Sequence, residues 1–176
     1  DPVAAKYVHK YVGARELLHN EDRWCLWLDG MDPQDLQRSR ILKHRVEAVK
    51  EFRLASKAAS TREYPYPHLF RQLAKQDEPY VCIPIHVSET RRYYPLAYFP
   101  ADVIASNANF IANDPDGFQF AIMSSSMFLA WQKAVGGRLE SRLRFASTLN
   151  WYTLPLPEVS ANDRAAIITA AQGVLA

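Results

Sequence analysis

A polar segment near the middle of the chain carries two adjacent arginines beside a glutamate. The segment is Ser88-Glu89-Thr90-Arg91-Arg92-Tyr93, and it follows an apolar run. Adjacent side chains on a strand or loop point in different directions, so one arginine can hold a phosphate or a guanine edge while the other pairs with Glu89. We assign Glu89 and Arg91 to base edges and Arg92 to a phosphate. The alternative is a surface cluster of salt bridges.

A second polar segment is rich in side-chain amides. It runs from Ser106 through Asn107 and Asn109 to Asn113. Amides of this kind can pair with adenine through its N6 and N7 atoms. These four residues are therefore candidates for hydrogen bonds to bases, and the alternative is a polar connecting loop.

Further cations and one hydroxyl are candidates for phosphate contacts. Helical spacing would place Arg138 and Arg142 on one face, although surface arginines also serve solubility. An amino-terminal helix turn near Ser124 can bind a phosphate through its free amides or can simply be a cap. The full set of candidates for backbone contacts is Arg92, Lys57, Arg62, Ser124, Arg138, Arg142 and Arg144.

Sequence motifs of catalysis are missing. We find no GxGxxG, no GxxxxGK[ST], no HExxH and no GxSxG, and the five histidines are scattered singly. Asn113-Asp114-Pro115-Asp116 lacks the second proline and the aromatic residue of the motif with which amino-methyltransferases grip an amine, so we predict a turn. The sequence alone predicts no catalytic residue, no metal ligand and no bound cofactor.

Composition is that of a single globular domain. The 176 residues are 48% hydrophobic and 12% aromatic, with a formal net charge of +2. That charge permits a nucleic-acid partner without requiring one. The sequence shows no membrane span and no signal-peptide core, and it lacks an initial Met, so we expect a cytoplasmic fragment of a longer polypeptide. We expect Cys25 and Cys82 to be buried, reduced thiols.

The apolar patterns predict strands interleaved with helices. We expect core strands at 23–28, 80–85 and 118–123, the first of them buried on both faces. Extended or looped chain is expected at 98–104 and 109–112, and extended chain at 149–156. Helices are expected at 32–59, from Ser124 or Ser125 to Gly136, and from about Asn162 onward. Residue types set the start of the first helix, where Asp32 is the cap and Pro33 the first helical residue. The fold class is therefore α/β or α+β mixed, with a twisted sheet and about three flanking helices.

Six segments carry a resemblance that runs in order along nearly the whole chain. Tyr11–Glu16 and Arg23–Leu28 match GAxEFI and RWCLWL, Val87–Pro95 resembles SSExRxYxP, Phe120–Trp131 resembles FGxLxSxMHxxWM, Gly137–Phe145 resembles GRLKSDYRY, and Asn150–Pro157 resembles YNNFPWP. These phrases are typical of MmeI-like fused restriction–modification enzymes. The chain departs from them at Phe128, Gln132, Leu143 and Leu154, where the family usually has His, Met, Tyr and Phe.

The resemblance implies a role and a context. It covers the target recognition domain, which we place at residues 1–158, with 159–176 starting a carboxyl-terminal helical segment. Such a domain binds double-stranded DNA and positions an adenine for the methyltransferase domain of the same polypeptide, where S-adenosylmethionine binds. The family's specificity positions lie in the stretch before FGxLxS, which favours the 106–113 segment. By itself the chain would then not be an enzyme.

A different function class stays open. The four tryptophans can serve a protein–protein docking module that makes no direct contact with DNA. Aromatic residues within apolar runs are more often core residues. The dependence of binding on salt separates the two functions, because phosphate contacts weaken steeply as salt rises.

Overall fold

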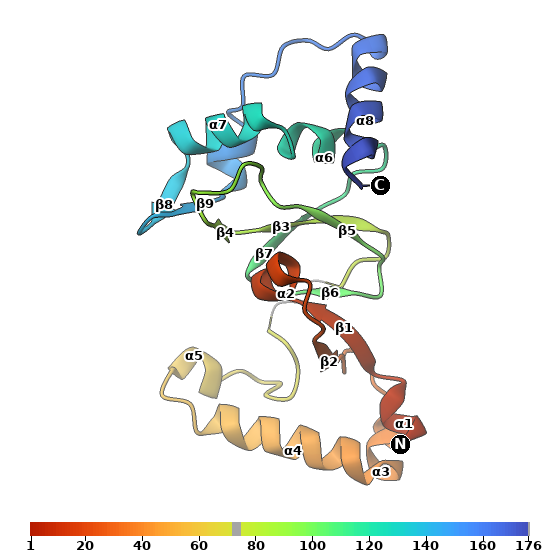
Figure 1. Ribbon diagram of the computed structural model, residues 1–176. Coiled ribbons are helices and arrows are strands. Elements are labelled where there is room, and N and C mark those ends of the chain that lie inside the picture. Colours follow the sequence, from red (N-terminus) through yellow and green to blue (C-terminus); the bar gives the residue numbers. More distant parts are fainter. Residues whose placement is uncertain (72–74, 176) are drawn as a thin grey trace. The chain divides into compact units, whose positions relative to one another are not determined.

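The computed structural model describes residues 1–71 and 75–175, in two compact units (Figure 1). The helical unit comprises Asp1–Tyr11 and Arg23–Ala74, and the sheet unit comprises Val12–Asp22 and Lys75–Ala176. Each unit has its own hydrophobic core. The described chain has three small sheets and several helices, which confirms the predicted mixed α/β class; the helices are shorter and more numerous than expected.

In the helical unit, short helices pack against a pair of antiparallel strands. Its elements are α1 (Pro2–Ala5), β1 (Val8–Val12, whose last residue belongs to the sheet unit), β2 (Trp24–Leu26), α3 (Pro33–Arg38), α4 (Arg40–Leu54) and α5 (Ala59–Arg62). Strands β1 and β2 are antiparallel, with His9 opposite Cys25. Leu42 and Val46 of α4 are buried against Ala4 and Leu28.

The single helix predicted at 32–59 is wrong, because Ser39 interrupts it. Ser39 has an extended backbone (φ −110°, ψ 106°) and ends α3 while capping α4. Its hydroxyl accepts a hydrogen bond from the Leu42 amide at 3.0 Å and donates one to the Asp1 carboxylate at 2.6 Å. The predicted start is confirmed, since Asp32 caps α3 and Pro33 is its first residue.

Asp35 is a buried carboxylate on α3. It accepts hydrogen bonds from Lys6 Nζ at 3.0 Å and from the Tyr7 hydroxyl at 2.9 Å. The Lys6 hydrogen bond, more than any other contact, lowers the pKa of Asp35. The ionised carboxylate therefore joins α3 to the turn between α1 and β1.

Strand β3 (Tyr80–Pro84) is the centre of the sheet unit and is buried at every residue. It pairs antiparallel with β5 (Ala97–Phe99) on one side and with β7 (Asn109–Ala112) on the other. Side chains alternate between the faces of a strand. Val81 and Ile83 accordingly join one core cluster, while Tyr80 and Cys82 join a second one. The predicted strand at 80–85 is confirmed.

Residue Ile85 joins this sheet to a second one. Beyond it, β4 (His86–Val87) pairs with β9 (Arg142–Arg144), which pairs with β8 (Gly137–Leu139). The Ile85 amide donates to the Ala108 carbonyl at 3.0 Å, and the Ile85 carbonyl accepts from the Phe145 amide at 2.8 Å. The continuous segment 80–87 therefore contributes a strand to each of the two small sheets.

Residues 118–123, predicted as a strand, form helix α6 (Phe118–Met123). The Asp114 carboxylate stabilises the start of this helix, because it accepts hydrogen bonds from the Gln119 amide at 3.0 Å and from the Phe120 amide at 2.9 Å. Gly117 enters the helix with φ 82°, a value that suits glycine. Because all of Phe120–Met123 is buried, the sequence lacked the polar face that marks a helix.

The sheet unit has further helical elements and one more short strand. They are α2 (Ala14–His19), α7 (Ser126–Val135), a π-helical turn (Ser147–Trp151) and α8 (Ala161–Leu175); β6 (Ile104–Ala105) completes the strands. Helix α7 begins at its cap Ser125 and ends at Gly136, as predicted, and α8 packs along α6. The extended chain predicted at 149–156 is wrong at its start, where the π-helical turn buries Asn150.

Side-chain burial differs from expectation in the first strand. Trp24 is 61% exposed, so β2 is not buried on both faces. Cys82 is buried and Cys25 half-buried, and both thiols are free. Desolvation raises the pKa of Cys25 to about 11 and that of Cys82 to about 12, which keeps both protonated at neutral pH. Among the described residues, no helix has the length and apolar character needed to span a membrane.

Replacing Asp114 by Ala is expected to destabilise the sheet unit by about 2–4 kcal/mol. The substitution leaves two amides and the Tyr98 hydroxyl, which donates to Asp114 at 2.6 Å, without their acceptor. Chemical denaturation measures the loss. Asp116→Ala is the matched control, because the contacts that it removes, an ion pair with Arg164 and a hydrogen bond from the Phe118 amide at 3.1 Å, are both exposed and contribute little. Equal losses for the two variants would contradict the assignment.

Asp35→Asn is expected to lower the melting temperature at neutral pH, with a difference from the parent chain that shrinks in acid. A carboxyl whose folded pKa is depressed stabilises the fold above its unfolded pKa and loses that effect as the pH falls through the folded pKa. The window therefore lies below about pH 4. Melting curves across that range test this, with the exposed Asp29→Asn as control; a difference independent of pH would refute it.

Candidate nucleic-acid interface

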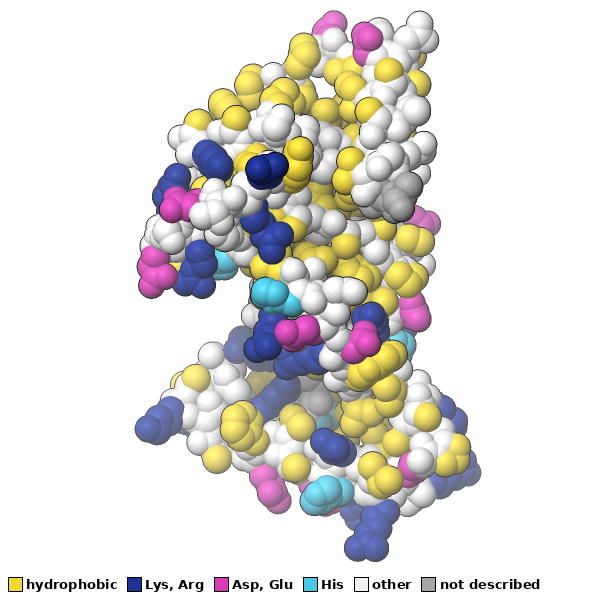
Figure 2. All heavy atoms as spheres, viewed as in Figure 1, with side chains coloured by type: hydrophobic (Ala, Val, Ile, Leu, Met, Phe, Trp, Pro, Cys, Tyr) yellow, Lys and Arg dark blue, Asp and Glu magenta, His cyan; other side chains and the backbone are white. Residues whose placement is uncertain are grey.

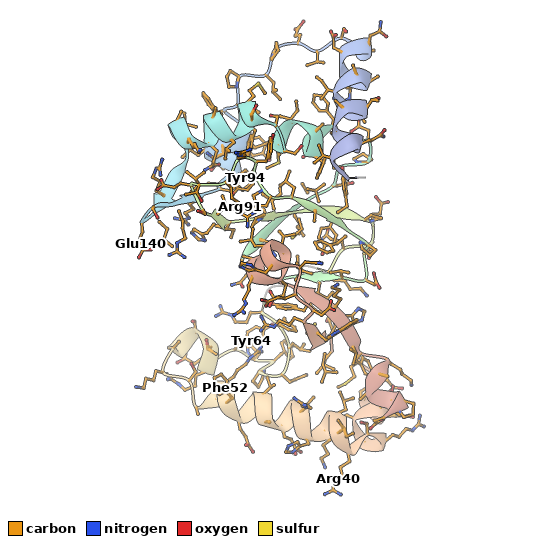
Figure 3. The ribbon with its side chains drawn as sticks, viewed as in Figure 1. Arg40, Phe52, Tyr64, Arg91, Tyr94 and Glu140 are labelled. Carbon is orange, nitrogen blue, oxygen red and sulfur yellow. The ribbon has the colours of Figure 1, made fainter. Side chains whose placement is uncertain are left out.

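The arginine loop, residues Ser88–Tyr94 between β4 and β5, begins with a turn that is held by hydrogen bonds of its hydroxyl side chains. Ser88 Oγ lies 2.8 Å from Thr90 Oγ1 and accepts from the Thr90 amide at 3.3 Å. The Arg91 amide donates to the Ser88 carbonyl at 3.3 Å. This tight turn presents Arg91 half-buried and Arg92 exposed, and Figure 3 labels Arg91 on the loop.

Tyr94 anchors the end of the arginine loop in the core. It is 1% exposed, and its hydroxyl donates to the Pro84 carbonyl at 2.8 Å. Its ring meets Phe128 edge-on at a centroid distance of 5.7 Å. Burial raises the pKa of Tyr94, so the hydroxyl remains a donor at any physiological pH. The loop thus has a fixed base under its two arginines.

The basic hairpin, residues Gly137–Arg144, corrects the helical spacing expected for its arginines. Arg138 lies on β8 opposite Leu143, and Arg142 lies on β9 opposite Leu139. A two-residue turn joins the strands, with Glu140 in the left-handed region at φ 57°. Figure 3 labels Glu140 at the tip of this hairpin.

Strand alternation places two of these arginines on one face. Leu143 is fully buried, so its neighbours Arg142 and Arg144 project to the opposite side, which we call the outer face. His86 on β4 lies directly opposite Arg144. Figure 2 shows dark blue side chains, interspersed with a few magenta ones, gathered over the region of β8 and β9.

His86 responds electrostatically to these arginines. Its pKa is lowered, first by partial burial and then by the charges of Arg144 and Arg142. The imidazole is therefore neutral at pH 7. The sequence analysis set His86 aside as one of five scattered histidines, and only the pairing of β4 with β9 reveals its place.

An ion pair joins the arginine loop to the basic hairpin. Arg138 Nη1 lies 2.7 Å from Glu89 Oε2, with both side chains partly exposed. Glu89 thus pairs with Arg138 rather than with a neighbour in its own loop, contrary to our expectation. Arg142 pairs with Glu140 at 3.0 Å. Within residues 1–71 and 75–175, Arg91, Arg92 and Arg144 have no acidic partner.

The amide-rich segment divides into buried and exposed members. Asn109 Nδ2 and the Ser106 amide both donate to the Val12 carbonyl at 2.8 Å, and both residues are buried. Asn109 Oδ1 is buried without a partner among the described residues. Asn107 and Asn113 are exposed. Only these two amides are freely presented to a ligand.

Ser124 and two cations of the helical unit were also candidates for phosphate contacts. Ser124 ends α6, and its hydroxyl donates to the Ala121 carbonyl at 3.2 Å, while Ser125 is the residue that caps α7. Lys57 and Arg62 are exposed in the helical unit, where Arg62 donates to the Ser56 carbonyl at 3.2 Å. In the part of the chain that the structure describes, no group of three potential metal ligands occurs.

Comparisons with known proteins identify the family of the chain. The profile of the family described as MmeI, target recognition domain, matches residues 1–158. A solved structure of the type IIL restriction–modification enzyme MmeI in complex with DNA is similar over 99% of this chain, with 36% identity and a TM-score of 0.92. DNA methyltransferase A of Bacillus subtilis (strain 168) is 29% identical over 160 residues.

Both relatives are much longer proteins. This chain spans 24% of the MmeI chain and 18% of the Bacillus subtilis protein. The similarity therefore concerns one module of a larger enzyme. With the family profile covering nine-tenths of its residues, the chain belongs to the MmeI target recognition domain family.

Proposed function

We propose that this domain binds double-stranded DNA in a sequence-dependent way and positions an adenine for a methyltransferase domain of the same polypeptide. The observation that carries the proposal is a pair of arginines, Arg91 and Arg92, that have no acidic partner among the described residues and lie on a loop whose end is fixed in the core by Tyr94. Rigid presentation matters, because a base contact has to be placed within hydrogen-bond reach. The solved MmeI relative was determined in complex with DNA, which supports the choice of ligand.

We assign base contacts to the arginine loop and its neighbours. Arg91 can donate two hydrogen bonds to a guanine edge, and Glu89 can accept from a cytosine amine once it leaves Arg138. Asn107 and Asn113 are exposed amides suited to adenine. Ser106 and Asn109 are bound to the Val12 carbonyl, so their role is to position the turn that carries Asn107.

We assign phosphate contacts to the exposed cations. Arg92, Arg142 and Arg144 are the principal ones, because they project from the arginine loop and the outer face of the hairpin. Weaker candidates of the same kind are Arg138, Lys57, Arg62 and the backbone near Ser124. Phosphate contacts of this type set register without discriminating between sequences.

The chemistry of the parent enzyme belongs to the rest of the polypeptide in this proposal. S-adenosylmethionine binds in a methyltransferase domain outside residues 1–176, and this domain supplies recognition. Within the described residues, the exposed cations and amides are suited to holding DNA.

A groove in the helical unit favours a second candidate function, docking to another protein surface. The groove has a volume of about 460 Å³ and is lined by apolar side chains that include Trp24, Ile41 and Val49. Each of these three side chains is at least 40% exposed. Apolar docking differs from phosphate binding in being insensitive to salt, which makes the two functions separable.

The double variant Arg91→Ala/Arg92→Ala is expected to weaken binding to random-sequence duplex DNA about tenfold or more at low salt, because two charges facing DNA are lost. Fluorescence anisotropy of a labelled duplex pool measures the affinity. The control Arg15→Ala/Lys133→Ala removes two positive charges elsewhere on the sheet unit and is expected to change affinity little. Equal losses in both variants, or no binding by the parent chain at low salt, would overturn the proposal.

Removing the outer-face arginines with Arg142→Ala/Arg144→Ala is expected to reduce the salt dependence of DNA binding. Each phosphate contact contributes about 0.9 to the slope of log K against log salt, so the slope should fall by about 1–2. Affinity should fall to a similar extent for every duplex sequence. An unchanged slope would show that these arginines do not contact phosphates.

A further inference from the structure

His86 lies where a third cation of the phosphate-binding face would be placed. The β4–β9 register places His86 opposite Arg144. Arg142 lies two residues before Arg144 on β9 and so projects from the same face. The imidazole is half-buried and forms no hydrogen bond with any residue that the structure describes. Its ring is therefore available to a ligand that approaches the two arginines.

The charges that act on His86 come from β9, the strand that pairs with β4 at the edge of its sheet. Arg142 and Arg144 of β9 repel its protonated form. The acidic groups of the same region are already engaged, Glu140 with Arg142 and Glu89 with Arg138. No carboxylate in the described chain is paired with His86. A third positive charge is disfavoured here until an anion arrives.

We propose that His86 is a proton-dependent phosphate ligand, neutral in the free domain and protonated when a DNA phosphate reaches the outer face. The approaching phosphate offsets the repulsion by Arg142 and Arg144 and offers the imidazolium a charge-assisted hydrogen bond. Binding of DNA then takes up a proton. This inference rests on the proposed function, since it deepens the assignment of the outer face to phosphates.

Proton uptake has a definite sign. A group that gains a proton in the complex makes the complex more stable as the pH falls through its titration range. DNA affinity should therefore rise about three- to tenfold between about pH 7.5 and pH 5.5, because one unit of pKa change corresponds to a factor of ten in the linked equilibrium. A variant that lacks only the His86 imidazole isolates its contribution.

The test is fluorescence anisotropy of labelled duplex DNA against the chain at the two pH values and fixed low salt. His86→Asn should bind with a much flatter pH dependence than the parent chain. His86→Lys, which keeps a positive charge, should bind at both pH values about as tightly as the parent chain does in acid. His44→Asn, an exposed histidine of the helical unit, is the matched control and should retain the parent's pH dependence.

The outcomes separate this inference from the proposed function. Salt-sensitive binding with the same pH dependence in His86→Asn and in the parent chain would overturn the role of His86 and leave the DNA-binding proposal intact. An absence of DNA binding by the parent chain at low salt would overturn both. A flat profile in His86→Asn together with tight binding by His86→Lys supports the inference, and equal melting temperatures show that both variants are folded.

Discussion

Burial of β3 on both faces is the constraint on which the sheet unit depends. Its alternating side chains enter two different core clusters, so the strand cannot shift by one residue without exchanging Val81 and Ile83 for Tyr80 and Cys82. The strand leads directly into Ile85, whose amide and carbonyl hold the turn at Ala108 and the end of β9. Its Pro84 carbonyl accepts from Tyr94. The arginine loop and the basic hairpin are therefore both hydrogen-bonded to one segment, β3 and Ile85, whose register is fixed by burial.

This arrangement fixes the backbone from which the exposed arginines project. A loop that is already fixed loses less backbone entropy when its arginines bind a ligand. Here the loop closes on a buried tyrosine, and the hairpin closes on the fully buried Leu143. The Glu89–Arg138 ion pair links the two segments at their exposed ends. Base and phosphate contacts would then share a common reference frame, which sequence recognition requires.

Sequence patterns predicted the elements whose signal is local. Caps at Asp32 and Ser125, the apolar strand β3 and the start of α8 near Asn162 were all expected and are confirmed. Tertiary contacts decided the rest: Asp114 turns an apolar run into α6, and a hydrogen bond to Asp1 breaks the long helix at Ser39. Strand pairing could not be predicted from the sequence either, so the hairpin arginines were misplaced and His86 was missed.

Family membership was predicted correctly, because the family's phrases are spread over the whole chain. Of the four departures from the family's phrases, those at Phe128, Gln132 and Leu143 fall at fully buried positions, and Leu154 is half-buried.

Amide hydrogen exchange of the chain, alone and with an excess of random-sequence duplex DNA at low salt, examines the proposed interface most directly. Binding through the arginine loop and the outer face requires slower exchange at residues 88–93 and 142–144 in the presence of DNA, with the buried strand 80–84 slow in both states. Protection confined to the helical unit, or no protection anywhere, would be incompatible with the assignment of DNA recognition to these two segments.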